Sequence, residues 1–233
     1  MTFSEWLKSI LGCQEVYWKS EANRLYGLCQ EYDEENKRLK EQLNQNNQKW
    51  DEGTKPEWLD TSQIPYEPLI EIEGEQIKLK PQDIYMECPT LRDIAVKWRD
   101  LSLDQKLWEI WKFVIVRLTY KYDKNENWLP PIISYVRKFG DCEDGTILFV
   151  TLARLAHVPA DSIFNGCGWY TDSSGNKFGH SFPIAKMLDD KWYIFETTID
   201  NIPTSPKLFK GSNYDGSWGM ANWKFAGKGP NQV

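Results

Sequence analysis

The N-terminal part of the chain alternates apolar and polar residues with a helical period. Residues 1–12 form an amphipathic pattern, and residues 14–50 contain no proline and fit a heptad frame. We therefore predict a helical region over 1–50. Its long helix either forms a coiled coil, and with it a homo-oligomer through residues 14–50, or lies solvated on the rest of the protein. One seam position of the heptad frame holds Ala22, Cys29, Asn36, Leu43 and Trp50.

A change of composition and of period marks the segment from 51 to 85. Residues 51–66 are rich in proline, glycine and turn-forming residues, which predicts a linker. Apolar and polar residues then alternate over 69–80 on both sides of Glu73-Gly74. This alternation is typical of a β-hairpin with a charged outer face.

Helical periods return between residues 86 and 155. We predict helices from Pro89 and over 103–120, and a short helix or turn over 132–139. Residues 103–120 are apolar nearly all round, so they should form a central buried helix. A further helix begins at Cys142. Its apolar positions recur at helical spacing and would form one buried face, made of Ile147, Leu148, Thr151, Leu152 and Leu155.

Strand patterns occupy the next part of the chain. Residues 161–171, 178–188 and 191–197 are rich in apolar and aromatic residues and are separated by turn signals, which predicts three strands. Residues 201–233 contain glycine, proline, serine and aromatic residues without a regular period, which predicts an irregular tail that wraps the core. The whole pattern predicts an α+β fold with a helical region over 1–50, a linker and hairpin over 51–85, a core over 86–200, and this tail.

Composition and charge exclude several classes of function. The 28 Lys and Arg residues against 34 Asp and Glu give a net charge of −6, so we expect no nucleic-acid partner. No apolar run reaches bilayer length, and the first residues lack the pattern of a secretory signal, so we expect no membrane association. Five scattered cysteines without a CxxC pair argue for the cytoplasm or another reducing compartment. We expect no metal site and no cofactor.

The helix that begins at Cys142 carries the first sign of chemistry. A glycine turn leads directly into this cysteine, which places the thiol in the first helical turn. Unpaired amide hydrogens and the helix dipole favour a thiolate at this position. Asp141 is a good N-cap residue, and Glu143 and Asp144 suit the positive end of the dipole. Cys142 is therefore a candidate nucleophile.

A cysteine nucleophile needs a base and a group that orients the base. His180 lies near the start of one predicted strand, and Glu196 ends the next one. A tight turn between these strands would place position 180 opposite a residue near 199, so Glu196 lies close to His180 without being directly opposite. The order Cys142, His180, Glu196 gives nucleophile, base and orienter. Asp200 and Asp141 are the alternatives for the acidic role.

Three separated motifs together resemble the transglutaminase-like superfamily. They are Gly140-Asp141-Cys142-Glu143-Asp144 with the helix that ends in Val158-Pro159-Ala160, then Gly179-His180, then Lys191-Trp192-Tyr193-Ile194-Phe195-Glu196. With Trp128 and Pro130 upstream, the chain looks closest to the bacterial transglutaminase-like cysteine proteinases. The resemblance covers about residues 86–200. It implies a papain-like core in which the nucleophile helix packs on an antiparallel sheet.

The resemblance also implies roles and shows departures. Cys142 would be the nucleophile, His180 the general base and then acid, and Glu196 the orienting group. The superfamily usually has aspartate where this chain has Glu196, and a glycine is common where His157 stands. Ser181-Phe182 replaces the usual small residue and tryptophan.

The expected chemistry is acyl transfer from a peptide or amide substrate. The Cys142 thiolate would attack the carbonyl, its backbone N–H would donate to the oxyanion, and Trp128 is a weak candidate for the second donor. We expect a thiol hydrolase, either a cysteine protease or an amidase, acting on a peptide or protein. The alternatives are a transglutaminase that crosslinks proteins, and a non-catalytic assembly protein that oligomerises through its N-terminal helix.

Overall fold

A computed structural model describes residues 55–62, 69–72, 75–78, 84–124 and 127–228 of the protein. The chain divides into two units, Met1–Lys49 and Trp50–Val233, and the described residues belong to the second unit. The predicted helices over 1–12 and 14–50, and the coiled coil with them, lie outside the described residues.

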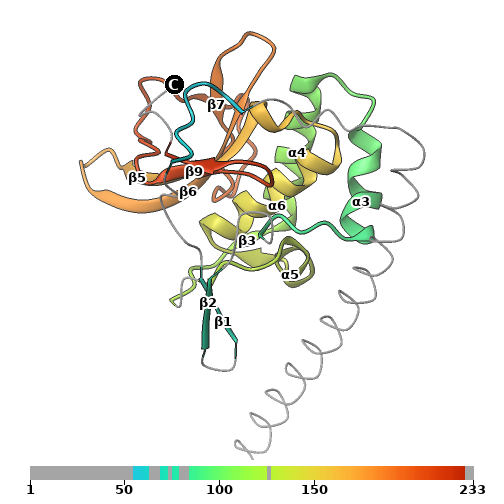
Figure 1. The fold of residues 1–233 in the computed structure, drawn as a ribbon, viewed down its shortest axis with the longest axis horizontal. Helices are drawn as coiled ribbons and strands as arrows, with labels where there is room; N and C mark the ends of the chain where they lie inside the picture. Colours follow the sequence, from blue (N-terminus) through green and yellow to red (C-terminus); the bar gives the residue numbers. More distant parts are fainter. Residues whose placement is uncertain (1–54, 63–68, 73–74, 79–83, 125–126, 229–233) are drawn as a thin grey trace, which may run out of the picture. The chain divides into compact units, whose positions relative to one another are not determined.

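A six-stranded antiparallel sheet and a group of helices form the described fold, which is of the α+β class (Figure 1). The strand order is β10-β9-β5-β6-β7-β8. The central strands are β5 (Ile163–Thr171), β6 (Lys177–Lys186) and β7 (Trp192–Ile194). The predicted strands over 161–171, 178–188 and 191–197 are therefore confirmed, and each is shorter than predicted.

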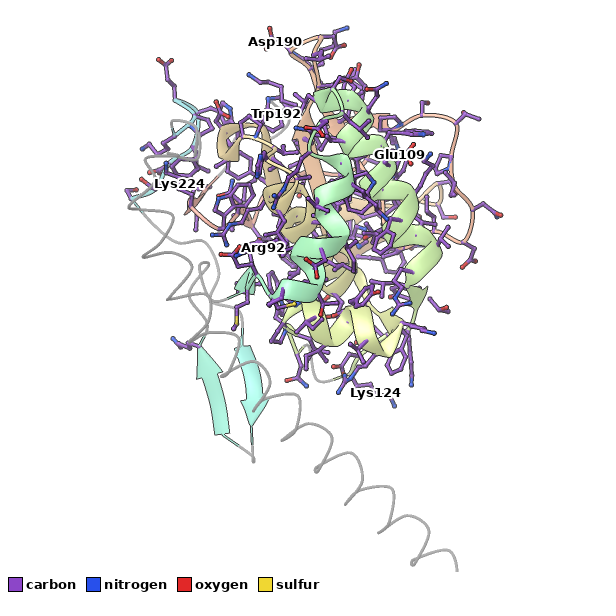
Figure 2. The ribbon with its side chains drawn as sticks, turned by 90° about the vertical axis from the view of Figure 1, so that its right-hand side faces the viewer. Arg92, Glu109, Lys124, Asp190, Trp192 and Lys224 are labelled. Atoms are coloured by element: carbon purple, nitrogen blue, oxygen red, sulfur yellow. The ribbon has the colours of Figure 1, made fainter. Side chains whose placement is uncertain are left out.

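The helix α6 (Cys142–Leu155) lies between the other helices and the sheet. It contacts α3 (Pro89–Ala95), α4 (Leu103–Arg117) and α5 (Pro131–Arg137) as well as β5 and β6. Figure 2 shows this helical layer from the side of α3, with Arg92 of α3 and Glu109 of α4 labelled. The sequence correctly predicts all four helices, with boundaries shifted by a few residues.

Among the described helices α6 is the most completely buried, whereas α4, predicted over 103–120 as a central buried helix, is buried only in part. Twelve of the fourteen residues of α6 are buried. In α4 the buried residues are Leu107, Ile110, Trp111, Val114 and Ile115, whereas Val116 is 77% exposed. An apolar composition does not specify how many faces of a helix are covered, because that depends on which elements pack against it.

The strands β5 and β6 form a long hairpin whose register runs from Ile163 opposite Ala185 to Thr171 opposite Lys177. The turn between them is held by Asp172, whose Oδ1 accepts hydrogen bonds from the N–H groups of Ser174 and Asn176 at 2.8 and 2.9 Å. Side chains alternate between the two faces, and two apolar clusters result, one towards α6 and one on the opposite face.

The tail is more regular than the sequence predicts. Residues 201–228 supply β8 (Lys207–Leu208), β9 (Gly219–Ala221) and β10 (Ala226–Gly227), and β9 pairs with β5 inside the main sheet. The prediction of an irregular tail is therefore corrected. Strands of two or three residues are too short to show a period of two, and they form because β5 and β7 offer unpaired backbone edges.

The remaining described elements are short. The strands β1 (Leu69–Ile72) and β2 (Glu75–Lys78) form the expected hairpin, and β3 (Thr119–Tyr120) pairs in parallel with β4 (Phe139–Gly140). Two 3₁₀ turns lie at Val96–Trp98 and Ala160–Ser162. In the part of the chain that the structure describes, no helix combines the length and the apolar character needed to cross a bilayer.

Candidate active site

The turn before α6 explains the glycine that precedes the candidate nucleophile. A Cβ on Gly140 would lie 2.5 Å from Oδ2 of Asp144, so only glycine lets the Asp144 side chain fold back over the turn. Gly140 also pairs with Tyr120 in the short β3–β4 ladder. The sequence Gly-Asp-Cys therefore delivers Cys142 to the first position of α6, as the sequence predicts.

The segment that carries Glu196 is held against α4 and α6 just after β7 ends. The indole N–H of Trp111 donates to the backbone carbonyl oxygen of Glu196 at 2.7 Å. A Cβ on Gly145 of α6 would lie 2.7 Å from Oγ1 of Thr197, so glycine at this helical position permits the close approach. These contacts fix where the Glu196 side chain begins.

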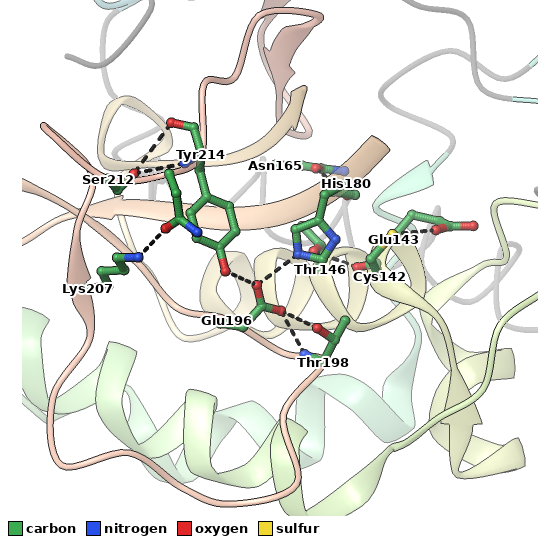
Figure 3. Close-up of polar contacts among 12 residues, drawn as sticks. Cys142, Glu143, Thr146, Asn165, His180, Glu196, Thr198, Lys207, Ser212 and Tyr214 are labelled. Carbon is green, nitrogen blue, oxygen red and sulfur yellow. Dashed lines mark hydrogen bonds and ion pairs between the residues drawn. The ribbon is translucent and has the colours of Figure 1, made fainter. Parts of the chain in front are cut away.

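The structure brings His180 and Glu196 together. Nε2 of His180 lies 2.8 Å from Oε2 of Glu196 (Figure 3). The β6–β7 register, with Ile184 opposite Ile194, is shifted by one residue from the register expected from the turn. The contact forms all the same because Glu196 lies beyond the paired part of β7, where the backbone is free to turn towards His180.

Both oxygens of the Glu196 carboxylate are fully engaged. Oε1 accepts hydrogen bonds from the backbone N–H and the hydroxyl of Thr198 at 2.8 and 2.7 Å, and Oε2 accepts one from the hydroxyl of Tyr214 at 2.8 Å. Burial alone would raise the pKa of Glu196, but the hydrogen bond and charge of His180, together with Thr198, lower it to about 2. Glu196 is therefore a fixed carboxylate.

The state of Glu196 determines the tautomer of His180. A carboxylate only accepts hydrogen bonds, so Nε2 of the neutral ring carries the proton and Nδ1 is left as the basic nitrogen. Figure 3 shows the His180 ring between Glu196 and Cys142. The three predicted residues thus meet at one place in the fold.

The Cys142 thiol differs from the expectation of a thiolate. Burial raises its pKa well above the ordinary value, and the nearby Glu143 carboxyl raises it further, while the Ser181 N–H acts in the opposite direction. Sγ donates a hydrogen bond to Oε2 of Glu143 at 3.3 Å. The helix N-terminus favours a thiolate, but burial beside carboxyl groups outweighs it, so the resting group is a thiol.

Three buried acidic residues surround the start of α6. Burial, followed by the charge of Asp141, raises the pKa of Glu143 to about 9 and that of Asp144 to about 7. Burial also raises the pKa of Asp141. Asp141 occupies the N-cap position, but its side chain does not cap the helix, and Oδ2 accepts a hydrogen bond from the Asp123 N–H at 3.2 Å. The predicted capping role of its side chain is therefore wrong.

The other predicted residues have clear positions. Trp128 is partly buried against the apolar cluster around α6, and its role as an oxyanion donor stays a prediction. Asp200 is exposed. The acidic residue that contacts His180 is Glu196, and not the alternatives Asp200 and Asp141. Cys167 is a buried thiol in β5, in agreement with its interpretation as a packed strand residue.

Sequence reasoning missed three residues that hold the acidic group, namely Trp111, Thr198 and Tyr214. Thr198 is two residues from Glu196, and a hydroxyl at that spacing commonly bonds to a nearby acceptor, so it could have been found. Trp111 lies 85 positions before Glu196 and Tyr214 lies 18 after it. No local pattern connects residues so far apart in the chain.

Comparisons with known proteins give matches among solved structures. LapG of Legionella pneumophila matches over 57% of this chain and 72% of LapG, with 14% identity and a TM-score of 0.42. Its calcium-bound form matches over 60% and 78%, with 18% identity and a TM-score of 0.41. A candidate cysteine protease of Cytophaga hutchinsonii matches over 52% of this chain and 39% of its own, with 16% identity and a TM-score of 0.40.

No family model and no curated protein matches the sequence. The chain is similar to these solved structures at an identity of 14–18%.

Proposed function

We propose that the protein is a thiol hydrolase with a papain-like core that cleaves an amide bond in a peptide or protein through an acyl-enzyme on Cys142. The observation that carries this proposal is the 2.8 Å contact between His180 Nε2 and Glu196 Oε2, beside a cysteine at the first position of a buried helix. A histidine held by a fixed carboxylate next to a thiol is the arrangement that nucleophilic acyl transfer requires.

The first half of the reaction forms the acyl-enzyme. Nδ1 of His180 takes the thiol proton as the Cys142 sulfur bonds to the substrate carbonyl carbon. The oxyanion that develops accepts a hydrogen bond from the Cys142 backbone N–H, one of the unpaired N–H groups at the helix start. The C–N bond then breaks, and the leaving amine receives the proton from Nδ1.

The second half releases the acid product. His180 removes a proton from a water molecule as the water oxygen bonds to the acyl carbon. The C–S bond then breaks, and the proton returns to the Cys142 sulfur. Glu196 stays ionised throughout and stabilises the imidazolium through Oε2, because its pKa is about 2. A peptide or protein is the proposed substrate, and the reaction uses no cofactor.

The raised pKa of Cys142 sets how the thiol is activated. Because the thiol is the resting form, proton transfer to His180 has to accompany nucleophilic attack. The thiol must also break its resting hydrogen bond to Oε2 of Glu143 before the proton moves to His180. We therefore expect the enzyme to be slow with small alkylating reagents at acidic pH and faster as the pH rises.

The test is iodoacetamide labelling mapped to individual cysteines by mass spectrometry. We expect Cys142 to be alkylated at neutral pH at least about tenfold faster than in the His180→Ala variant, a difference of about 1.4 kcal/mol in activation free energy. The buried Cys88 and Cys167 serve as internal controls and should remain unlabelled in the folded protein.

Two outcomes would count against the proposal. Equal labelling of Cys142 in the intact protein and in His180→Ala would show that the histidine does not activate the thiol. Amide hydrolysis that survives Cys142→Ala would show that the reaction does not pass through this residue.

A further inference from the structure

Two tryptophans lie exposed on the sheet face near the site. Trp169 at the outer end of β5 is 38% exposed, and Trp218 in the loop before β9 is 40% exposed. Their rings meet edge to face, with centroids 5.0 Å apart and planes inclined by 77°. A paired aromatic surface in contact with water is costly for a protein to maintain, and such surfaces commonly mark binding sites.

The strand register places this pair on the same sheet face as α6. Side chains alternate along a strand, and Trp169 is opposite Gly179 while Cys167 is opposite Ser181. These odd-numbered positions share the face on which Ile163 and Ala185 pack against α6. Beyond Ser181 this face continues to the tip of the β5–β6 hairpin. Because α6 begins at Cys142, it does not extend over the hairpin tip (Figure 1).

The pair is close to the candidate nucleophile. Figure 3 shows the His180 ring beside Cys142, and Gly179 directly precedes His180 in β6. The Trp218 ring covers Gly179, because a Cβ there would lie 2.6 Å from its Cη2 atom. The Trp218 surface therefore begins at the residue next to the candidate base.

Backbone hydrogen bonds hold the Trp218 loop in place. Asp215 N–H donates to the Trp169 carbonyl at 3.1 Å, and Asp215 Oδ1 accepts from the Trp169 N–H at 2.8 Å. The Trp218 N–H donates to the Cys167 carbonyl at 2.9 Å. Gly168 permits this contact, since a Cβ there would lie 2.3 Å from Asp215 Oδ1. The aromatic surface is thus preorganised, which reduces the entropy cost of binding.

We propose that Trp218 and Trp169 form a specificity-determining subsite for a large apolar or aromatic side chain of the peptide substrate. This proposal rests on the hydrolase function proposed above. The side chain belongs to a residue near the scissile amide, because the Trp218 ring lies over Gly179, which directly precedes the candidate base. It packs on the Trp218 ring, which discriminates against small polar and acidic side chains at that position.

The experiment measures peptide binding separately from chemistry. The probe is a positional-scanning library of fluorescein-labelled peptides, and binding to the full-length Cys142→Ala protein is read by fluorescence anisotropy. We expect pools with Phe, Leu or Trp at one fixed position to bind at least about tenfold tighter than pools with Ser or Asp there, a difference of about 1.4 kcal/mol. Trp218→Ala in the same background should remove this preference.

Two further variants keep the proposal testable if the loop is disturbed. Gly179→Ala displaces the Trp218 ring and leaves the indole intact, and it should weaken the preference in the same direction. Leu188→Ala removes an exposed apolar side chain elsewhere, 66% exposed at the β6–β7 turn, and should have no effect. Circular dichroism confirms that each variant is folded.

The outcomes separate this proposal from the proposed function. Loss of the preference in Trp218→Ala, with unchanged iodoacetamide labelling of Cys142 in the otherwise intact protein, supports the subsite. A preference that persists in folded Trp218→Ala and Gly179→Ala, or no preference among pools, overturns it. Selective peptide binding without His180-dependent labelling of Cys142 would support the binding surface and reject the hydrolase function.

Discussion

The hydroxyl of Tyr214 and the imidazole of His180 meet on one oxygen of Glu196. Tyr214 donates to Oε2 at 2.8 Å, and Nε2 of His180 lies 2.8 Å from the same atom. The Tyr214 ring also lies beside the His180 ring, with centroids 5.7 Å apart. A residue from the C-terminal part of the chain therefore fixes both the carboxylate and the imidazole that it orients.

Replacing Tyr214 with phenylalanine tests this relationship. Tyr214→Phe removes one donor from a buried carboxylate, and we expect a loss of about 2 kcal/mol in the free energy of unfolding. We also expect the pH profile of Cys142 alkylation to shift, because His180 is held less firmly. Urea denaturation and labelling rates measure the two effects.

Tyr170→Phe is the matched control for this change. Its ring contacts that of Tyr214, with centroids 4.9 Å apart, and Glu196 accepts its hydrogen bonds from other residues. Equal effects of the two substitutions on the labelling profile would argue that ring packing, and not the Tyr214 hydroxyl, positions the pair.

Shortening the acidic side chain should impair activation of the thiol. Glu196→Asp withdraws the carboxylate by one methylene group, so it cannot keep its contacts with both His180 and Thr198. We expect Cys142 labelling to slow by about tenfold, which corresponds to about 1.4 kcal/mol. Thr198→Val, which keeps the backbone N–H bond but loses the hydroxyl, should have a smaller effect. Full activity in Glu196→Asp would show that this geometry is not required.

Acid stability should depend on Glu196. Its pKa is about 2 in the folded protein against an ordinary value of 4.5, so its contribution to stability is present above the ordinary value and is lost as the pH falls towards 2. Glu196→Gln cannot titrate and should flatten this part of the stability curve. Urea denaturation at several pH values between 5 and 2 measures the free energy of unfolding, and Glu57→Gln, at an exposed position, is the control. An unchanged acid slope in Glu196→Gln would contradict the assignment.

Glu143 should give the opposite pH dependence. Its pKa is about 9 in the folded protein, so the folded state holds a proton that the unfolded state has released above the ordinary value of 4.5. The stabilisation is complete below that value and is lost as the pH rises towards 9. We expect Glu143→Gln to flatten this decline, measured by urea denaturation between pH 5 and pH 9.

The same substitution should activate the thiol. The Glu143 carboxyl raises the pKa of Cys142, and its removal should move Cys142 alkylation to lower pH. An alkylation profile that does not move, in a folded Glu143→Gln protein, would mean that burial alone raises the pKa.

Gly145 should be required for the position of Glu196. In Gly145→Ala the new Cβ would meet Oγ1 of Thr197 at 2.7 Å, which forces the Glu196 segment away from α6. Overpacking of this kind costs about 1–3 kcal/mol, partly offset by the higher helix propensity of alanine, about 1 kcal/mol. Thermal unfolding and Cys142 labelling should both show a loss.

A second substitution checks the cause of that loss. Thr197→Gly removes the atoms that the new Cβ would meet, and it should restore part of the labelling rate in the double variant. Failure of the double variant to recover any activity would place the defect elsewhere in α6.

Local patterns predicted much of the fold and the three candidate residues. Periodicity located α3, α4, α5 and α6, which are long enough to show their period. The strands β5, β6 and β7 were located by their apolar and aromatic residues and the turn signals between them. The expected tight turn between β6 and β7 predicted that His180 lies near Glu196, although the observed β6–β7 register differs by one residue from the expected one. Thr198 was within reach of the same reasoning, since it lies next to the predicted acidic group.

The errors share one physical origin. The prediction that residues 103–120 form a central buried helix, and the expectation that the helix start favours a thiolate at Cys142, both depended on how much protein surrounds a residue. Composition and local spacing do not contain that quantity, because burial results from contacts between elements far apart in the chain.

The sequence by itself determined which residues are candidates for the proposed chemistry and where the main helices and strands lie. Only the tertiary structure decided the burial of Cys142 beside Glu143, the position of Tyr214 on Glu196, and the aromatic pair of Trp169 and Trp218. The reason is that secondary structure follows from interactions between near neighbours, whereas pKa values, hydrogen-bond partners and exposed surfaces depend on residues that only folding brings together.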